Sequence, residues 1–253
     1  MRIAVIGSGI SGMVAAHLLC QEHEVVVFEA NDYVGGHTHT VDVKLNGGVY
    51  PVDTGFIVFN EVTYPNFVKL LRRLGVTWKP SQMSFSVKSE KDDFEYSPSS
   101  LNALFATRRN LVSPSFYRMI LDVFRFKKTS LELLEGHDTH TSLGAYLTKN
   151  HYSRRFVENF IIPMGSAIWS ADPDKFWHFP ARHFVQFFRN HGFLQVRNQP
   201  QWQVIEGGSK CYVEPLTRDY RDRIRLGCPV ESVIRHRDAV EVRVSGNQAD
   251  VFD

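Results

Sequence analysis

The sequence has few cysteines, no long apolar run and no excess of either charge. Its three cysteines, Cys20, Cys211 and Cys228, are irregularly spaced among 253 residues, so they form neither a disulfide framework nor a metal-binding pattern. We therefore expect a reducing, cytoplasmic location. No apolar run reaches the roughly 20 residues that a membrane-spanning helix needs. The formal net charge of +2 gives no general basis for binding nucleic acid.

Several catalytic and metal-binding patterns are also missing. The chain has no G-x-S-x-G turn, no H-E-x-x-H motif and no P-loop. His37 and His39 would share one face of a strand, but no nearby acid or cysteine completes a metal set, so we predict no metal site. His137, Asp138 and His140 are interpreted as a solvated loop rather than as metal ligands.

The clearest functional pattern lies at the start of the chain. An apolar strand at residues 2–6 leads into Gly7-Ser8-Gly9-Ile10-Ser11-Gly12 and an apolar helix, and a second apolar strand ends on Glu29. This order is the G-x-G-x-x-G fingerprint of a βαβ unit that binds the ADP part of a dinucleotide.

Each fingerprint residue has a physical role. Gly7 permits the tight turn, Gly9 lets the backbone approach a pyrophosphate, and Gly12 lets the helix pack on the strand. The helix N-terminus, with Ser11 in its first turn, offers N–H groups and a positive dipole end to phosphates. The Glu29 carboxylate can accept hydrogen bonds from ribose hydroxyls and would repel a 2′-phosphate, which disfavours NADP.

Residues 29–38 resemble the FAD-dependent amine oxidase and phytoene desaturase superfamily. They read E-A-x4-G-G followed by His37, where the superfamily has arginine. In that superfamily the second glycine pair, here Gly35-Gly36, lets the backbone run beside the flavin's phosphates and ribityl chain, which implies FAD as the cofactor. The G-G-H-T-x-T-V form is similar to a bacterial subgroup of FAD-binding oxidoreductases, and to flavin domains fused to some cyclopropane fatty acid synthases.

Further segments resemble the same superfamily. Residues 52–59 resemble its D-x-G strand and turn, and Gly207-Gly208-Ser209 resembles the segment that returns the chain to the flavin domain, although a simple strand-to-helix turn is the alternative. The strand at residues 229–234 resembles the one that holds the adenine, with Val230 at the matching position. The resemblance and the fingerprint together predict cofactor contacts at Gly7, Gly9, Ser11, Gly12, Glu29, Gly35, Gly36, His37 and Val230.

The order of elements predicts an α/β protein, with a Rossmann-like FAD-binding domain and an inserted, mostly helical α+β substrate domain. We place the FAD-binding domain at residues 1–60 and 203–253, and the substrate or cap domain at residues 61–202. The resemblance also implies a further substrate segment and a C-terminal glycine-rich motif. Neither is found, so we expect the chain to be C-terminally truncated.

Hydrophobic periodicity and turn signals place individual elements. We expect helices at residues 64–74, 115–134, 142–149, 154–162 (ending before Pro163) and 180–190. We expect hairpins at residues 41–52 and 83–96, and strands at residues 223–226, 230–235 and 240–244.

Two segments have alternative interpretations. Residues 156–193 are rich in aromatic side chains, for which core packing is preferred over an apolar substrate tunnel lined partly by Met164, Ile168 and Trp169. The helix at residues 116–128 mixes apolar and basic residues. An ordinary packed helix is preferred over one that makes peripheral contact with a membrane.

The leading hypothesis is an FAD-dependent oxidoreductase that transfers a hydride from a small apolar molecule, such as a fatty acyl chain, to flavin. No catalytic residue is predicted, because the cofactor carries out the redox chemistry. An FAD-dependent amine oxidase is the enzymatic alternative. A non-catalytic dinucleotide-binding module, or a fragment that needs a partner chain, is the alternative outside enzymes.

Overall fold

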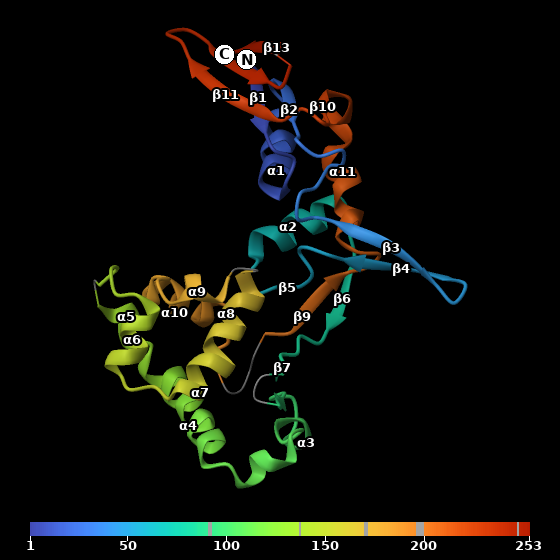
Figure 1. Cartoon of the computed structure of the whole chain (residues 1–253). Helices are drawn as coiled ribbons and strands as arrows, with labels where there is room; N and C mark the ends of the chain where they lie inside the picture. Colours follow the sequence, from blue (N-terminus) through green and yellow to red (C-terminus); the bar gives the residue numbers. More distant parts are fainter. Residues whose placement is uncertain (91–92, 137, 170–171, 196–199, 247) are drawn as a thin grey trace. The chain divides into compact units, whose positions relative to one another are not determined.

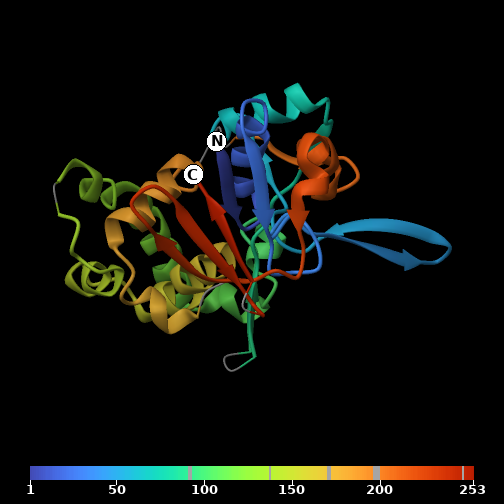
Figure 2. The ribbon, with the colours of Figure 1, turned by 90° about the horizontal axis from the view of Figure 1, so that it is seen from above.

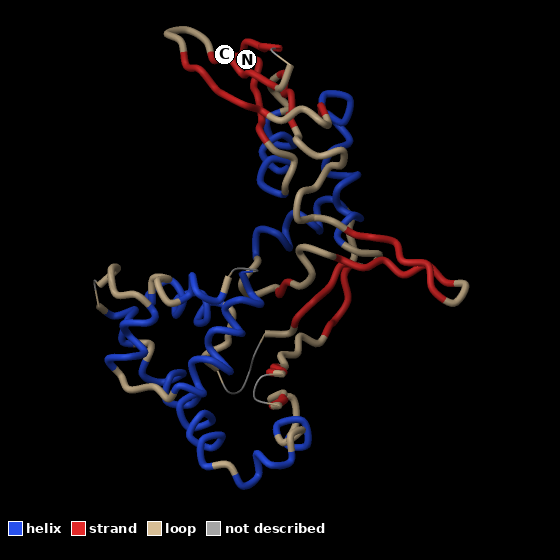
Figure 3. The backbone as a smooth tube through the Cα atoms, in the orientation of Figure 1, coloured by secondary structure: helices blue, strands red, loops and turns tan. Residues whose placement is uncertain are grey.

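The computed structural model describes residues 1–90, 93–136, 138–169, 172–195, 200–246 and 248–253. The chain divides into two units, the first formed by residues 1–81 and 201–253, and the second by residues 82–200. Figure 3 shows that the longer strands belong to the first unit, whereas the second is mostly helical.

The first unit contains a three-stranded parallel sheet in the order β1-β2-β10. Helix α1 (Ile10–Leu19) connects β1 (Arg2–Ile6) to β2 (Glu24–Phe28), and β10 (Ile224–Arg225) pairs with the other edge of β2. The valines of β2 are buried, as is typical of a parallel strand covered on both faces.

Different elements cover the two faces of this sheet. On one face, Ala16 of α1 and Tyr220 pack with Val25 and Val27. On the other face lies an antiparallel meander, whose strands appear red in Figure 2. Its buried residues pack with Val26 and Phe28. The strands of the meander are β11 (Val230–Arg235), β12 (Val240–Val244) and β13 (Gln248–Phe252).

A second sheet of the first unit has the order β5-β9-β6. Helix α2 (Pro65–Leu74) buries Val68 and Leu71 in a core shared with Phe59 and Ile205. Because α2 and β6 pack in this way, the first unit extends to residue 81, rather than ending its first segment at residue 60. The strands are β5 (Phe59–Asn60), β6 (Trp78–Ser81) and β9 (Trp202–Ile205).

The predicted hairpin at residues 41–52 is present. Strands β3 (Thr40–Leu45) and β4 (Gly48–Asp53) are joined at Asn46 and Gly47, whose φ values of 50° and 78° suit a two-residue hairpin turn. Most residues of both strands are exposed, and Figure 1 shows the hairpin projecting from the rest of the first unit. Helix α11 (Val213–Thr217), flanked by 3-10 turns, completes this unit.

The second unit packs its helices around phenylalanine side chains. None of the described helices, in either unit, is both long and apolar enough to cross a membrane. Its strands are β7 (Val87–Ser89) and β8 (Phe94–Tyr96), which pair with each other. Its helices are α3 (Leu101–Leu104), α4 (Pro114–Thr129), α5 (Glu132–Glu135), α6 (Leu143–Lys149), α7 (Arg154–Phe156), α8 (Ile162–Trp169), α9 (Pro173–Phe176) and α10 (Ala181–Asn190).

The helix expected to stop before Pro163 instead continues through it. A π-helical turn over Val157–Ile161 joins α7 to α8, which contains Pro163. Proline lacks an N–H, and its ring conflicts with the carbonyl four residues earlier in a regular α-helix. The wider turn directly before the proline relieves that conflict, so the prediction of an end at residue 162 was wrong.

Two other predicted elements are shorter than expected. The helix predicted at residues 115–134 ends at Thr129, whose hydroxyl donates to the Arg125 carbonyl oxygen and so competes with helical hydrogen bonds. The strand predicted from residue 83 begins at Val87. The Phe85 carbonyl oxygen accepts from the Ser97 hydroxyl instead of joining a ladder.

We expect Gly12→Ala to destabilise the first unit. A Cβ at Gly12 would lie 1.9 Å from the Gly7 carbonyl oxygen, so α1 would have to move away from β1. Overpacking of this kind costs about 1–3 kcal/mol or more, which urea unfolding would measure. Gly9→Ala is the matched control, since its Cβ would meet no protein atom within 4 Å. Equal losses in both variants would contradict the packing role of Gly12.

Candidate dinucleotide-binding site

The glycine turn lies at the carboxyl end of β1 and in front of α1. The Gly7 N–H donates to the Phe28 carbonyl oxygen at 2.7 Å, and the φ of Gly7 is +91°. Gly9 is the N-cap of α1 and has no side chain to cap the first turn, in which Ser11 is exposed. The helix therefore presents amide N–H groups and its positive dipole end at this position.

Gly9 is not required by the protein's own packing. Its φ of −64° and ψ of 174° suit any residue, and a Cβ there would have no protein atom within 4 Å. A ligand that approaches the backbone closely would require glycine at this position. This observation fits a pyrophosphate bound at the start of α1.

The second glycine pair, Gly35-Gly36, lies against the glycine turn. Gly9 and Gly35 form an isolated parallel bridge, and a Cβ at Gly36 would lie 3.1 Å from the Gly9 Cα. The Gly35 N–H also donates to the Ser8 hydroxyl oxygen at 3.2 Å. The structure therefore brings both glycine motifs of the sequence into one site.

The Glu29 carboxylate joins the end of β2 to the glycine turn. Its Oε2 accepts from the N–H and the hydroxyl of Ser8 at 2.8 and 2.5 Å, and its Oε1 accepts from the N–H and Nδ2 of Asn31 at 2.9 and 3.0 Å. Glu29 is 5% exposed. Burial raises its pKa, but the hydrogen bonds outweigh burial and hold the pKa below the ordinary 4.5, so the carboxylate is charged at neutral pH.

Sequence reasoning did not identify Ser8, although its side chain is fully buried and contacts both Glu29 and Gly35. The available signal was its place between the first two glycines. The backbone N–H there reaches the acid that ends the second strand, so a short polar side chain can reach the same acid.

The two further segments that resemble the superfamily, residues 52–59 and 207–209, meet at Asp53. Its Oδ1 accepts from the Ser209 N–H and hydroxyl, both at 2.8 Å, and from the Thr40 hydroxyl at 2.6 Å. Next to Ser209, Gly208 has a φ of +88°, and a Cβ there would lie 2.5 Å from Thr40 Cγ2. The turn at residues 207–209 is therefore docked on the base of the β3–β4 hairpin.

The two histidines after the glycine pair have different surroundings. His37 is exposed, and its carbonyl oxygen accepts from the Phe56 N–H at 2.8 Å. The His39 Nδ1 pairs with the Thr54 hydroxyl at 2.7 Å. Within the described part of the chain, no group of three or more His, Cys, Asp or Glu residues is placed to hold a metal. His137 lies outside the described residues.

The segment before Val230 reaches the end of β2. The Glu29 N–H donates to the Arg225 carbonyl oxygen at 2.9 Å, and the Cys228 N–H donates to the Glu29 carbonyl oxygen at 2.8 Å. Val230 itself pairs with Val244 and is partly buried in the core of the meander. Its contact with an adenine stays a prediction.

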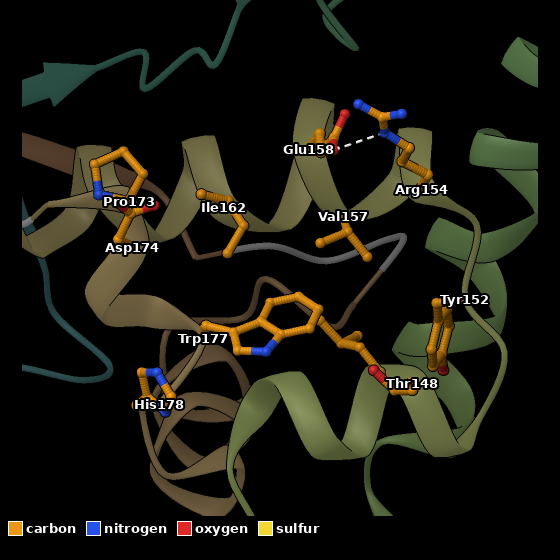
Figure 4. Close-up of a pocket in the computed structure, with 11 residues that line it drawn as sticks. Thr148, Tyr152, Arg154, Val157, Glu158, Ile162, Pro173, Asp174, Trp177 and His178 are labelled. Carbon is orange, nitrogen blue, oxygen red and sulfur yellow. Dashed lines mark hydrogen bonds and ion pairs between the residues drawn. The ribbon is translucent and has the colours of Figure 1, made fainter.

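The second unit contains a cavity of about 710 Å³. Figure 4 shows the Trp177 indole facing this cavity, with the Arg154–Glu158 ion pair at 2.8 Å on its border. Trp177 is 42% exposed, whereas Met164, Ile168 and Trp169 pack against the aromatic core. These three residues therefore pack in the core, as the preferred interpretation expected. A substrate tunnel beside them stays a prediction.

Residues 10–253 match the family model of flavin containing amine oxidoreductases. The flavin-dependent L-tryptophan oxidase RebO of Lentzea aerocolonigenes is 25% identical over 96% of this chain and 54% of its own length. Polyamine oxidase 3 of Oryza sativa subsp. japonica is 26% identical over 98% of this chain and 49% of its own length. The chain thus spans about half the length of the curated relatives it matches.

Solved structures share the fold. A double mutant of putrescine oxidase has a TM-score of 0.70 at 18% identity, covering 98% of this chain and 56% of that one. Cyclohexylamine oxidase from Brevibacterium oxydans has a TM-score of 0.68 at 20% identity, covering 99% of this chain and 56% of that one. The predicted α/β fold class is confirmed.

We expect Ser8→Ala to destabilise the first unit by about 1–3 kcal/mol, because it leaves the buried Gly35 N–H without its partner and removes a donor to a charged carboxylate. Chemical denaturation would measure the loss. Ser11→Ala is the control in the same turn, since Ser11 is exposed and its substitution should change stability by less than about 0.5 kcal/mol. Similar effects of the two variants would refute the connecting role of Ser8.

The glycine turn, the second glycine pair and Glu29 form one site, in a chain whose family match covers most of its length. The superfamily predicted from the motifs is thereby confirmed. The chain belongs to the family of flavin-containing amine oxidoreductases.

Proposed function

We propose that the first unit binds the ADP part of FAD, and that the protein is an FAD-dependent oxidoreductase. The observation that carries this proposal is the open space at Gly9, in front of α1 and beside Gly36. The pyrophosphate would contact the backbone at Gly9 and the first turn of α1, which includes Ser11 and Gly12.

Other predicted contacts follow from this placement. Glu29 would bind the ribose, Gly36 would lie beside the phosphates, and the backbone at Val230 would hold the adenine. His37, exposed after the glycine pair, would face the ribityl side. When bound, FAD supplies a flavin ring that accepts a hydride from the substrate, so the residues of this chain bind and orient rather than react.

The substrate is proposed to be a small molecule, either an apolar compound such as an acyl chain or an amine. The relatives that match nearly the whole chain are named as a tryptophan oxidase, a polyamine oxidase and a monoamine oxidase. A diapophytoene desaturase of Staphylococcus aureus matches only 24% of the chain. These names support testing amines before acyl chains.

The proposed site predicts that Gly9→Ala weakens FAD binding without unfolding the protein. A methyl group would enter the space assigned to the pyrophosphate, at a cost equivalent to about tenfold or more in affinity. Titration of the purified chain with FAD, followed by visible absorbance and its bleaching by dithionite, measures the change. Gly136→Ala in the second unit is the control, because a Cβ there meets nothing closer than 3.9 Å.

Two outcomes would contradict the proposal. Equal FAD affinity of the wild type and Gly9→Ala would remove the pyrophosphate assignment. A wild-type chain that stays colourless with added FAD, but still binds ADP, would favour the non-catalytic nucleotide-binding module.

Asn31 controls access to Glu29 in this arrangement. A carboxylate has about four acceptor positions, and here the four donors come from Ser8 and Asn31. Two of these donors are backbone N–H groups and one is a buried hydroxyl. The fourth donor, Asn31 Nδ2, lies on the side chain of an exposed residue. A ribose hydroxyl would therefore reach Glu29 by taking the place of Asn31 Nδ2 on Oε1.

Asn31→Ala should accordingly tighten ADP binding by about twofold to tenfold, the equivalent of one net hydrogen bond. Calorimetric titration with ADP, 2′-deoxy-ADP and 3′-deoxy-ADP measures the effect. The gain should disappear for the one deoxynucleotide that lacks the contacted hydroxyl. Asn102→Ala, at an exposed asparagine of the second unit, should leave all three affinities unchanged. Weaker ADP binding, or an equal gain for all three nucleotides, would count against displacement.

A further inference from the structure

We propose that one face of the second unit docks on the surface of an anionic lipid bilayer. The face is the outward side of α4 together with the turn that precedes it, and we call it the α4 surface. It is defined by exposed apolar residues, namely Leu111 (49% exposed), Val112 (83%), Tyr117 (44%), Leu121 (64%) and Phe124 (53%). This inference goes beyond the proposed function and does not depend on it.

Three residues of the α4 surface share one side of the helix. Tyr117, Leu121 and Phe124 are spaced four and three residues apart, so they form a stripe along α4. The Tyr117 hydroxyl donates to the Leu111 carbonyl oxygen at 3.0 Å, which ties the preceding turn to the start of this stripe. The opposite side of α4 carries Phe116, Met119 and Phe126, which are buried in the core.

Most of the charges on α4 and the turn before it are positive. Residues 96–131 contain one acid, Asp122, and it is only 1% exposed. The same segment contains six basic residues, namely Arg108, Arg109, Arg118, Arg125, Lys127 and Lys128. Arg109 forms an ion pair with the exposed Asp93 at 3.4 Å, so the excess of positive charge lies along α4 itself, although the whole chain is almost neutral.

Asp122 fixes two of these cations beside the apolar stripe. Its carboxylate accepts from the Ser153 N–H at 2.9 Å, and lies 3.0 Å from the Arg125 guanidinium and 3.5 Å from that of Arg118. On the helical wheel Arg118 and Arg125 flank the stripe on one edge, and Lys128 lies within it. An apolar stripe bordered by cations is typical of a helix that lies in the plane of a membrane interface.

A bilayer fits the α4 surface better than solvent or an acidic protein does. Large apolar side chains gain little from an acidic protein partner alone, but they can enter the acyl boundary while the cations contact lipid phosphates. Contiguous exposed apolar surface of this kind marks an interaction site rather than ordinary solvent-facing structure. Lipid headgroups that carry net negative charge supply both requirements at once.

Vesicle co-sedimentation of the full chain tests the proposal. We expect binding to vesicles of phosphatidylcholine with about one third phosphatidylglycerol, little binding to phosphatidylcholine alone, and weaker binding in high salt. The double substitution Leu121→Ser with Phe124→Ser should reduce the affinity for anionic vesicles about tenfold or more, because it removes the apolar contribution. Lys128→Glu should also weaken binding, through reversal of charge.

Matched controls use equally exposed residues outside the α4 surface. Leu45→Ser with Val49→Ser on the β3–β4 hairpin, and Lys149→Glu on α6, should leave vesicle binding unchanged. Absence of binding to anionic vesicles would overturn the proposal, as would equal losses in the hairpin control. Binding of polyglutamate that requires the α4 surface, without binding of vesicles, would replace the bilayer by an acidic protein partner.

Discussion

One buried carboxylate connects the segments that form the nucleotide site. Glu29 lies at the carboxyl end of β2, and Ser8 links it to the glycine turn and to the Gly35 amide. A charged group at this depth is tolerated only because hydrogen bonds replace the lost water. The geometry of the turn, and thus the direction of the α1 amides, depends on that replacement.

The sequence predicted the local elements of this site with few errors. The turn, α1, β2 and the acid lie within thirty residues, so their spacing alone determines how they meet. The second glycine pair follows directly and was predicted by resemblance. The bridge between Gly9 and Gly35 is nonetheless a tertiary contact, and no pattern in the sequence states it.

The sequence did not predict the long-range contacts, nor the local changes of structure that relieve a steric conflict. The Asp53–Ser209 hydrogen bonds join residues far apart in the chain, and each motif taken alone suggested only a turn. Pro163 was taken as the end of a helix because a proline's cost is local, whereas the π-helical turn that relieves it depends on the whole segment from α7 to α8. The assignment of residues 61–81 to the first unit likewise depends on a shared core around Leu71.

The two proposed activities rest on different physics. Nucleotide binding depends on backbone amides, a missing side chain at Gly9 and one carboxylate, all in the first unit. Docking on a bilayer depends on summed apolar area and charge over α4, in the second unit. Loss of one therefore leaves the other intact.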